Sequence, residues 1–284
     1  MNLKRISIIF AFVTLVLVSV QGLVAQTKLP VPAPSQALKA MSLNGATGLF
    51  SIPSGRIGWE EAADLGVDVG TAYNFNKEDP FAKLGMSLFK WAEVTAATDF
   101  QPYIKGYSHH NRYSEFLNNT DTILGLKIRF PTKRTAVALG GNVQFINHVD
   151  SRTAGQVYLA ATYPGSFFGM PAETSFALGY TIHEENTSNI DFGMGFDLDL
   201  APEIFQHFVH WVTDFSNFSY SDEPLGAEPF FRGCFNTGLR IDLSAIPVLS
   251  KFKFSVDIMG TDLFDEGARS FVMGLVFGIP VLGN

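Results

Sequence analysis

The sequence predicts an all-β protein, a closed antiparallel transmembrane β-barrel of about 12 strands and of the outer-membrane type. Three observations support this fold class. Apolar and polar residues alternate along many short segments, the number of these segments is even, and an export signal precedes them. The clearest segment is NIDFGMGFDLDLA, residues 189–201, where large apolar residues alternate with Asp or Gly. Successive side chains of a strand point to opposite faces, so this segment has one apolar and one polar face.

The N-terminal 25 residues are typical of a secretory signal peptide. Lys4 and Arg5 precede an apolar run that ends in small residues at Ala25. A membrane anchor is the alternative, but the run is short for a membrane span. Residues 26–44 are Pro-rich and then weakly helical, so we expect a periplasmic leader there and the barrel over residues 45–284.

The composition argues against several classes of protein. Without Lys4 and Arg5, 18 of the 20 basic residues remain against 27 acidic ones, so the net charge changes from −7 to −9. An acidic chain without a basic patch is a poor partner for nucleic acid. Cys234 is the only cysteine, which excludes an internal disulfide framework, a Cys-rich zinc site and a thiol redox pair. After residue 25 no apolar run reaches the length of about 18 residues that a membrane helix needs.

Turn residues separate the alternating segments and set the bounds of the expected strands. The strands are expected at residues 66–75, 82–89, 93–106, 121–130, 136–146, 154–163, 173–182, 190–200, 206–217, 234–243, 252–260 and 270–279. Pro102 makes the third strand the least regular. If the last strand runs toward the periplasm, the longer connections lie outside the cell and the shorter ones lie in the periplasm, as is typical of these barrels.

The polar faces of the strands mix Gly with sparse charges of both signs. A soluble β-sandwich is the alternative fold, but its solvent faces are usually richer in Lys, Glu and Thr. Small residues and opposite charges instead suit a crowded lumen. The residues expected to line the lumen are Lys127, Arg129, Asp191, Asp197, Asp199, Arg240, Asp242, Lys253 and Asp257. The residues expected to face lipid on the opening segment are Phe192, Met194, Phe196 and Leu198.

Residues 45–58, GATGLFSIPSGRIG, precede the first expected strand and resemble the start of the YjbH-like outer-membrane family. The matching residues are Gly45, Gly48, Leu49, Pro53, Ser54 and Arg56, whereas Gly55 stands where the family usually has Ala. The segments NTGLRIDL and RSFVMGLVFGIP are similar to later strands of the same family. The resemblance implies a barrel linked to export or assembly of exopolysaccharide. This chain is much shorter than the long family members, so the resemblance does not extend to their additional regions.

Trp59 lies just beyond residues 45–58 and is expected in a short helix at the barrel mouth.

Catalytic and metal-binding motifs are not found in the sequence. The segment EIFQHFVH contains Glu203, His207 and His210, but on the expected strand the two histidines point to opposite faces, which does not suit a metal site. His109 and His110 lie in a polar stretch that predicts a loop. No nucleophile elbow, zinc helix or phosphate-binding loop is present. A His/Ser pair within HFVHWVTDFSNFS is the remaining enzymatic alternative.

The sequence therefore predicts a non-enzymatic protein of the bacterial outer membrane, with no cofactor and no metal. Assistance to exopolysaccharide export or assembly is the main functional hypothesis. A diffusion pore or carrier for small or lipidic solutes is the second, and a structural or adhesive surface protein is the third. The expected partners are outer-membrane lipid and either polysaccharide or envelope assembly proteins. The sequence does not decide between an open and a plugged lumen.

Overall fold

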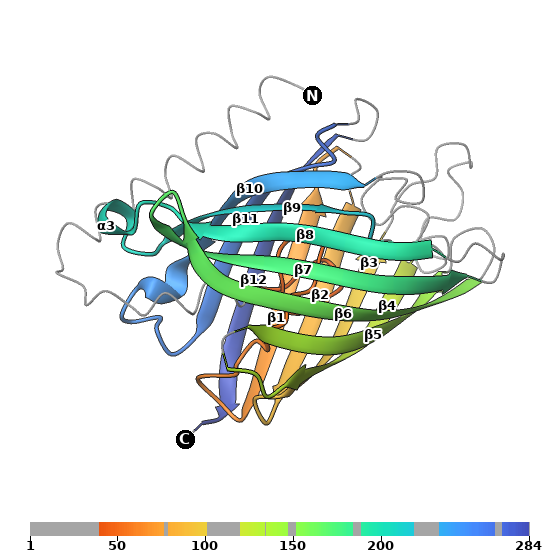
Figure 1. Ribbon diagram of the computed structural model, residues 1–284, viewed down its shortest axis with the longest axis horizontal. Coiled ribbons are helices and arrows are strands. Elements are labelled where there is room, and N and C mark those ends of the chain that lie inside the picture. The colour runs from red at the N-terminus through yellow and green to blue at the C-terminus, as the bar shows by residue number, and fades with distance from the viewer. Residues whose placement is uncertain are drawn as a thin grey trace, which may run out of the picture. The chain divides into compact units, whose positions relative to one another are not determined.

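A computed structural model of the chain shows a closed barrel of twelve antiparallel strands (Figure 1). The structure describes residues 40–76, 79–100, 120–133, 135–146, 152–183, 189–218, 233–264 and 269–283. The chain divides into two compact units, Met1–Pro32 and Ala33–Asn284, and every described residue belongs to the second. The expected signal peptide lies outside the described residues.

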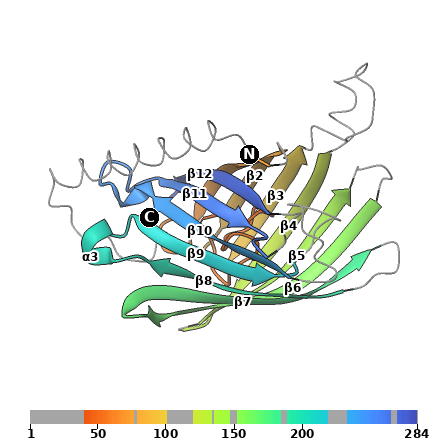
Figure 2. The same cartoon turned by 90° about the horizontal axis from the view of Figure 1, so that it is seen from above.

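Each strand pairs with its neighbours in sequence, and the first strand pairs with the last. The strands are β1 Leu65–Asn74, β2 Asp79–Leu88, β3 Ala92–Phe100, β4 Thr120–Phe130, β5 Ala136–Ile146, β6 Arg152–Phe167, β7 Met170–His183, β8 Asn189–Asp199, β9 Val209–Ser216, β10 Cys234–Asp242, β11 Lys253–Thr261 and β12 Ser270–Leu282. The β1–β12 ladder closes the sheet, with one register shift between Leu65 and Gly66. Figure 2 shows the same barrel turned by 90°. A closed sheet leaves no edge of unpaired backbone groups, which is what a strand structure in lipid requires.

The outer face of the barrel is apolar and exposed, whereas the inner face is polar and buried. On β8, Ile190 and Met194 are 64% and 56% exposed. Asp191 and Asp197, on the opposite face of the same strand, are 0% and 1% exposed. Outward side chains of this size and number are unfavourable in water and suit a lipid environment. The alternation predicted from the sequence is therefore that of a bacterial outer-membrane barrel, and the β-sandwich alternative is excluded.

The predicted lipid-facing residues of β8 follow this pattern with one exception. Phe192 and Met194 are exposed, and Phe196 packs against the rings of Phe167 and Trp211. Leu198 alternates with buried aspartates and is opposite Trp211 in the β8–β9 register, but it is only 1% exposed. The prediction that Leu198 faces lipid is therefore wrong.

Two connections differ from the sequence-based bounds. Strands β6 and β7 are longer than expected and meet in a tight turn at Phe168 and Gly169, both with positive φ (51° and 79°). Such a turn matches the twist of a hairpin, but the Pro and Gly residues around it suggest a longer loop in the sequence. Between β8 and β9, a short helix, α3 Pro202–Phe205, begins at a proline and delays the start of β9 to Val209. The expected strand start at residue 206 is therefore wrong. The expected extension of the third strand to residue 106 lies outside the described residues.

No helix within the described ranges is long and apolar enough to cross a bilayer.

Residues 40–60 lie inside the barrel, and we call this segment the plug. Its orange trace runs among the strands in both views (Figures 1 and 2). Backbone hydrogen bonds from Leu43 N to Phe50 O (3.0 Å) and from Ser54 N to Thr47 O (2.9 Å) fold it back on itself. The plug includes residues 40–44, which are buried like the residues that follow them.

Trp59 belongs to the plug rather than to a helix at the mouth. Residues 58–62 form turns, and the indole Nε1 of Trp59 donates a hydrogen bond to Asp68 on β1 at 2.8 Å. The predicted helix is therefore wrong. The reason is local: Gly58 and the two acidic residues after Trp59 start a turn that leads directly into β1.

Candidate functional site: the plugged lumen

The candidate site is the contact between the plug and the inner wall of the barrel. Short polar side chains shape the plug at its first turn. Asn44 Oδ1 accepts a hydrogen bond from Ala46 N (3.1 Å), and Ser42 Oγ donates to Ala46 O (2.9 Å). Gly45 between them has φ of +84°, a value that favours glycine. The plug carries only two charged side chains, Arg56 and Glu60, so most of its contacts are made by backbone groups and hydroxyls.

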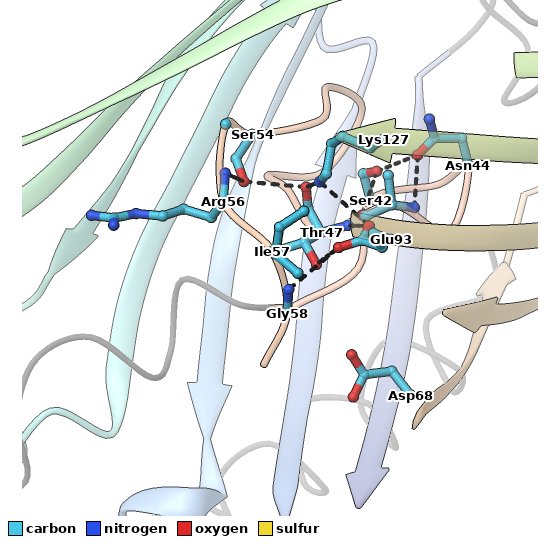
Figure 3. Close-up of polar contacts among 12 residues, drawn as sticks. Ser42, Asn44, Thr47, Ser54, Arg56, Ile57, Gly58, Asp68, Glu93 and Lys127 are labelled. Carbon is cyan, nitrogen blue, oxygen red and sulfur yellow. Dashed lines mark hydrogen bonds and ion pairs between the residues drawn. The ribbon is translucent and has the colours of Figure 1, made fainter. Parts of the chain in front are cut away.

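Glu93, near the start of β3, holds the first half of the plug (Figure 3). Its Oε1 accepts from Thr47 N and its Oε2 from Thr47 Oγ1, both at 2.6 Å. Gly58 N also donates to Oε2, at 3.3 Å. Lys127 on β4 pairs with Glu93 Oε1 at 3.3 Å and donates to Thr47 O at 2.9 Å. One ion pair of the wall therefore binds both the donor groups and the carbonyl of Thr47.

Asp214 on β9 makes a similar contact with the middle of the plug. Its Oδ2 accepts from Phe50 N at 2.9 Å and from Ser51 N at 2.7 Å. Its Oδ1 accepts from Ser51 Oγ at 2.8 Å and from the amide of Asn236, on β10, at 2.8 Å. Hydrogen bonds to a charged acceptor are stronger than neutral ones, so Asp214 is a main anchor of the plug.

Arg56 anchors the last part of the plug. Its guanidinium pairs with Glu173 on β7 at 2.5 Å and with Glu60 at 3.1 Å, and Glu60 in turn pairs with Arg129 on β4 at 3.0 Å. Burial lowers the pKa of Arg56, but Glu173 and Glu60 raise it more, so its pKa lies above the ordinary value and the group stays charged. Beside it, Gly55 N donates to Thr162 Oγ1 on β6 at 2.9 Å. A side chain at Gly55 would collide with the wall, since an added Cβ would lie 2.2 Å from Ala136 O.

Other charges of the inner wall pair with each other rather than with the plug. Arg240 on β10 binds Asp257 on β11 through two hydrogen bonds, of 2.8 Å and 3.1 Å, and lies 3.5 Å from Asp197 on β8. Lys253 on β11 pairs with Asp68 on β1 at 2.5 Å. The plug contributes to these pairs through the carbonyls of residues 48 and 49, which Arg240 reaches at 3.3 Å and 3.5 Å, and through the indole of Trp59, which donates to Asp68 at 2.8 Å. Much of the charge of the wall is thus compensated within the wall.

Of the nine residues predicted to line the lumen, eight are buried and Arg129 is half-buried. The structure brings Asp197, Arg240 and Asp257 into one network. The others have separate partners. Lys127 pairs with Glu93, Arg129 with Glu60, Lys253 with Asp68, Asp199 with His207, Asp191 with Thr181 and Gln156, and Asp242 with Ser244.

Sequence reasoning missed the plug and three of its wall anchors, Glu93, Glu173 and Asp214. The alternation of inward and outward residues along the strands could have indicated such anchors. Glu93 and Lys127, for example, are directly opposite in the β3–β4 register and share the inner face. Asp214 was not predicted because apolar and polar residues alternate poorly in the segment around it, HWVTDFSN. The plug has no periodicity at all, so only its contacts reveal its position.

His207, before β9, and His210, on β9, each contact a separate aspartate. His207 precedes β9, so the prediction that both histidines lie on one strand and point to opposite faces is wrong. Both are buried, and Nδ1 of each contacts an aspartate, Asp199 for His207 and Asp197 for His210. Within the described ranges, no group of three or more His, Cys, Asp or Glu side chains is arranged to hold a metal ion. The pair at residues 109 and 110 lies outside them.

Comparisons with known proteins bear on the fold alone. No protein-family model matches the chain, and no curated protein matches it. Among solved structures, the chain is similar to the KdgM porin, with a TM-score of 0.46, 4% identity, and coverage of 75% of this chain and 98% of that chain. It is similar to the NanC porin with a TM-score of 0.43, 8% identity and coverage of 75% and 97%. It is similar to the outer-membrane protein Omp33 of Acinetobacter baumannii with a TM-score of 0.41, 12% identity, and coverage of 77% of this chain and 98% of that chain.

Proposed function

We propose that the protein is a non-enzymatic outer-membrane pore for small polar solutes, closed in this structure by the plug. The observation that carries the proposal is the set of ion pairs that join strands of the wall without the plug. The pair of Arg240 with Asp257 joins β10 to β11, and the pair of Lys253 with Asp68 joins β11 to β1. A barrel that is filled permanently gains nothing from buried ion pairs, because apolar packing of the same volume is usually at least as stable. A wall whose charges are already paired can take up water when the plug withdraws.

The chemistry of the plug fits a segment that moves. It is anchored by hydrogen bonds to Glu93 and Asp214 and by one arginine, and a hydrated lumen offers water to the same groups. The net contribution of each hydrogen bond is about 0.5–1.5 kcal/mol, and about 1.5–3 kcal/mol when one partner is charged. Loss of one anchor therefore changes the equilibrium between closed and open states by a measurable factor.

Conductance in planar bilayers tests the proposal. We expect wild-type protein to be mostly silent and Arg56→Ala to open often, because the change removes the contacts with both Glu173 and Glu60. The matched control is Lys90→Ala. Lys90 pairs with Asp64 at 3.4 Å, both groups are partly exposed, and neither contacts the plug. If Arg56→Ala is folded and remains as silent as Lys90→Ala at high voltage, the barrel is a filled scaffold and the pore proposal is wrong.

Assistance to exopolysaccharide export is a second candidate, favoured by one observation. The six residues that resemble the YjbH-like start all lie within the plug, so the resemblance falls on the segment that occupies the lumen. If this candidate is right, deletion of the gene lowers secreted polysaccharide and leaves the uptake of small solutes unchanged. Unchanged polysaccharide with slower uptake favours the pore.

A further inference from the structure

We infer that Glu93 and Asp214 are two solute subsites of the lumen that recognise neutral, polyhydroxylated solutes such as oligosaccharides, and that the plug occupies them as an internal competitor. This inference rests on the proposed pore function. It adds the chemical class of the solute and the residues that bind it.

The geometry of the two anchors is the first argument. Each carboxylate accepts a backbone N–H and a hydroxyl from a single plug residue, and each of its two oxygens takes one of these donors. The distances are 2.6 Å and 2.6 Å for Thr47 on Glu93, and 2.7 Å and 2.8 Å for Ser51 on Asp214. An ionised carboxylate accepts only, and its two oxygens match a pair of adjacent donors. Neighbouring hydroxyls of a sugar ring are such a pair.

The wall holds both carboxylates in place independently of the plug. Lys127 lies 3.3 Å from Glu93, and Asn236 donates to Asp214 at 2.8 Å. Both supporting side chains come from strands, so they remain when the plug withdraws. A carboxylate fixed in this way loses little orientational freedom when a solute binds, which is the condition for useful affinity.

The charge of the inner face is the second argument. Besides Glu93 and Asp214, the buried carboxylates include Asp68, Asp191, Asp197 and Asp257, and among the buried residues of the described strands the carboxylates outnumber Lys and Arg. A narrow passage whose wall has an excess of one sign of charge disfavours solutes of that sign. Neutral sugars are therefore accepted, and acidic sugars are disfavoured.

Fluorescence of Trp59 provides the test, because this residue is part of the plug and is buried against Asp68. The full chain with Trp91→Phe and Trp211→Phe keeps Trp59 as its only tryptophan. The probes are linear trisaccharides of glucose, mannose and galactose, which together present trans and cis pairs of neighbouring hydroxyls, and trigalacturonic acid as the anionic probe. We expect at least one neutral trisaccharide to shift the emission of Trp59 to longer wavelength with saturation, and trigalacturonic acid to have a weaker effect.

Substitutions assign the effect to the subsites. Asp214→Asn and Glu93→Gln keep the shape of each side chain but remove its charge, and each is expected to weaken the saturable response about tenfold or more. Asp64→Asn, which removes a carboxylate outside the lumen, is the control and is expected to leave the response unchanged. Failure of all three neutral probes, an equal response to trigalacturonic acid, or an unchanged response in both subsite variants each overturns the inference.

The outcomes separate this inference from the proposed function. If Arg56→Ala conducts but no sugar moves Trp59, the pore stands and the subsites are wrong. If sugars move Trp59 but no plug variant conducts, the subsites stand and the pore is wrong.

Discussion

Gly55→Ala is the sharpest perturbation of the closed state, because it adds a single carbon at the contact between plug and wall. The new Cβ would lie 2.2 Å from Ala136 O, 2.7 Å from Ala136 C and 3.2 Å from Ala160 O. All three atoms belong to the backbone of β5 and β6, which pair along their whole shared length, so the wall cannot give way. Nonbonded carbon contacts prefer about 3.5–4.0 Å, so the plug has to retreat by roughly 1 Å or more.

The energetic cost follows from two effects. Overpacking of this kind costs about 1–3 kcal/mol. The retreat also weakens the hydrogen bond from Gly55 N to Thr162 Oγ1, at about 0.5–1.5 kcal/mol. Together they destabilise the closed state by about 2–4 kcal/mol, which is a factor of about 30 to 700 in the ratio of open to closed protein, given tenfold for each 1.4 kcal/mol.

Single-channel recording measures this ratio directly. We expect Gly55→Ala to raise the open probability by a factor in this range, and Gly155→Ala to leave it unchanged. Gly155 lies on β6, one of the two strands that Gly55 faces, but a Cβ added at Gly155 meets nothing within 4 Å. Heat-modifiable gel mobility checks that both variants keep a folded barrel. A folded Gly55→Ala protein that is as silent as Gly155→Ala would refute the reasoning that plug contact keeps the lumen closed.

Three further predictions concern the barrel itself. Val157→Arg, at the middle of the β5–β6 ladder and on the outer face, should lower the free energy of unfolding in lipid by about 2–4 kcal/mol, as measured by urea titration in vesicles; no loss would contradict the assignment of this face to lipid. In a Cys234→Ser background, Asn76→Cys should react with an impermeant thiol reagent on whole cells and Lys133→Cys should not; the opposite labelling would invert the orientation. Lys83→Met should leave the free energy of unfolding unchanged or slightly higher, since this buried ammonium has one hydrogen-bond acceptor among the described residues, Met41 O at 3.2 Å; a loss above about 2 kcal/mol would show that the charge is needed for folding.

The strands could be predicted from the sequence where alternation is unbroken. The observed β5, Ala136–Ile146, agrees with its predicted bounds, because small or polar residues alternate with larger apolar ones along most of it. The residues expected to face inward on β4 and β8 were predicted from the same alternation. The predicted bounds were less accurate at the ends of the strands, where turn geometry rather than the alternation of polarity determines the last residue. The positive φ at Phe168 and the proline-initiated helix before β9 are local conformations that alternation does not report.

The candidate site was harder to predict than the strands. Lys127 and Arg240 were predicted to line the lumen, but their most informative contacts are with carbonyl groups of the plug, and no pattern of side chains indicates a backbone acceptor. The plug is short, rich in Gly and Ser and almost uncharged, so it reads as a plain lead-in to the first strand. Its place inside the barrel depends on partners that are up to 192 residues away in sequence, as for Gly48 and Arg240. Sequence analysis of a single chain does not detect such distant pairings.

The pairing of β1 with β12 has a consequence for the order of assembly. The plug precedes β1 and is synthesised before every strand that contacts it, while the seam that encloses it needs β12, the last strand to be made. Contacts between such distant parts of a chain form slowly. The plug can therefore contact the inner face of the curved sheet before the seam joins, so that the barrel closes around it.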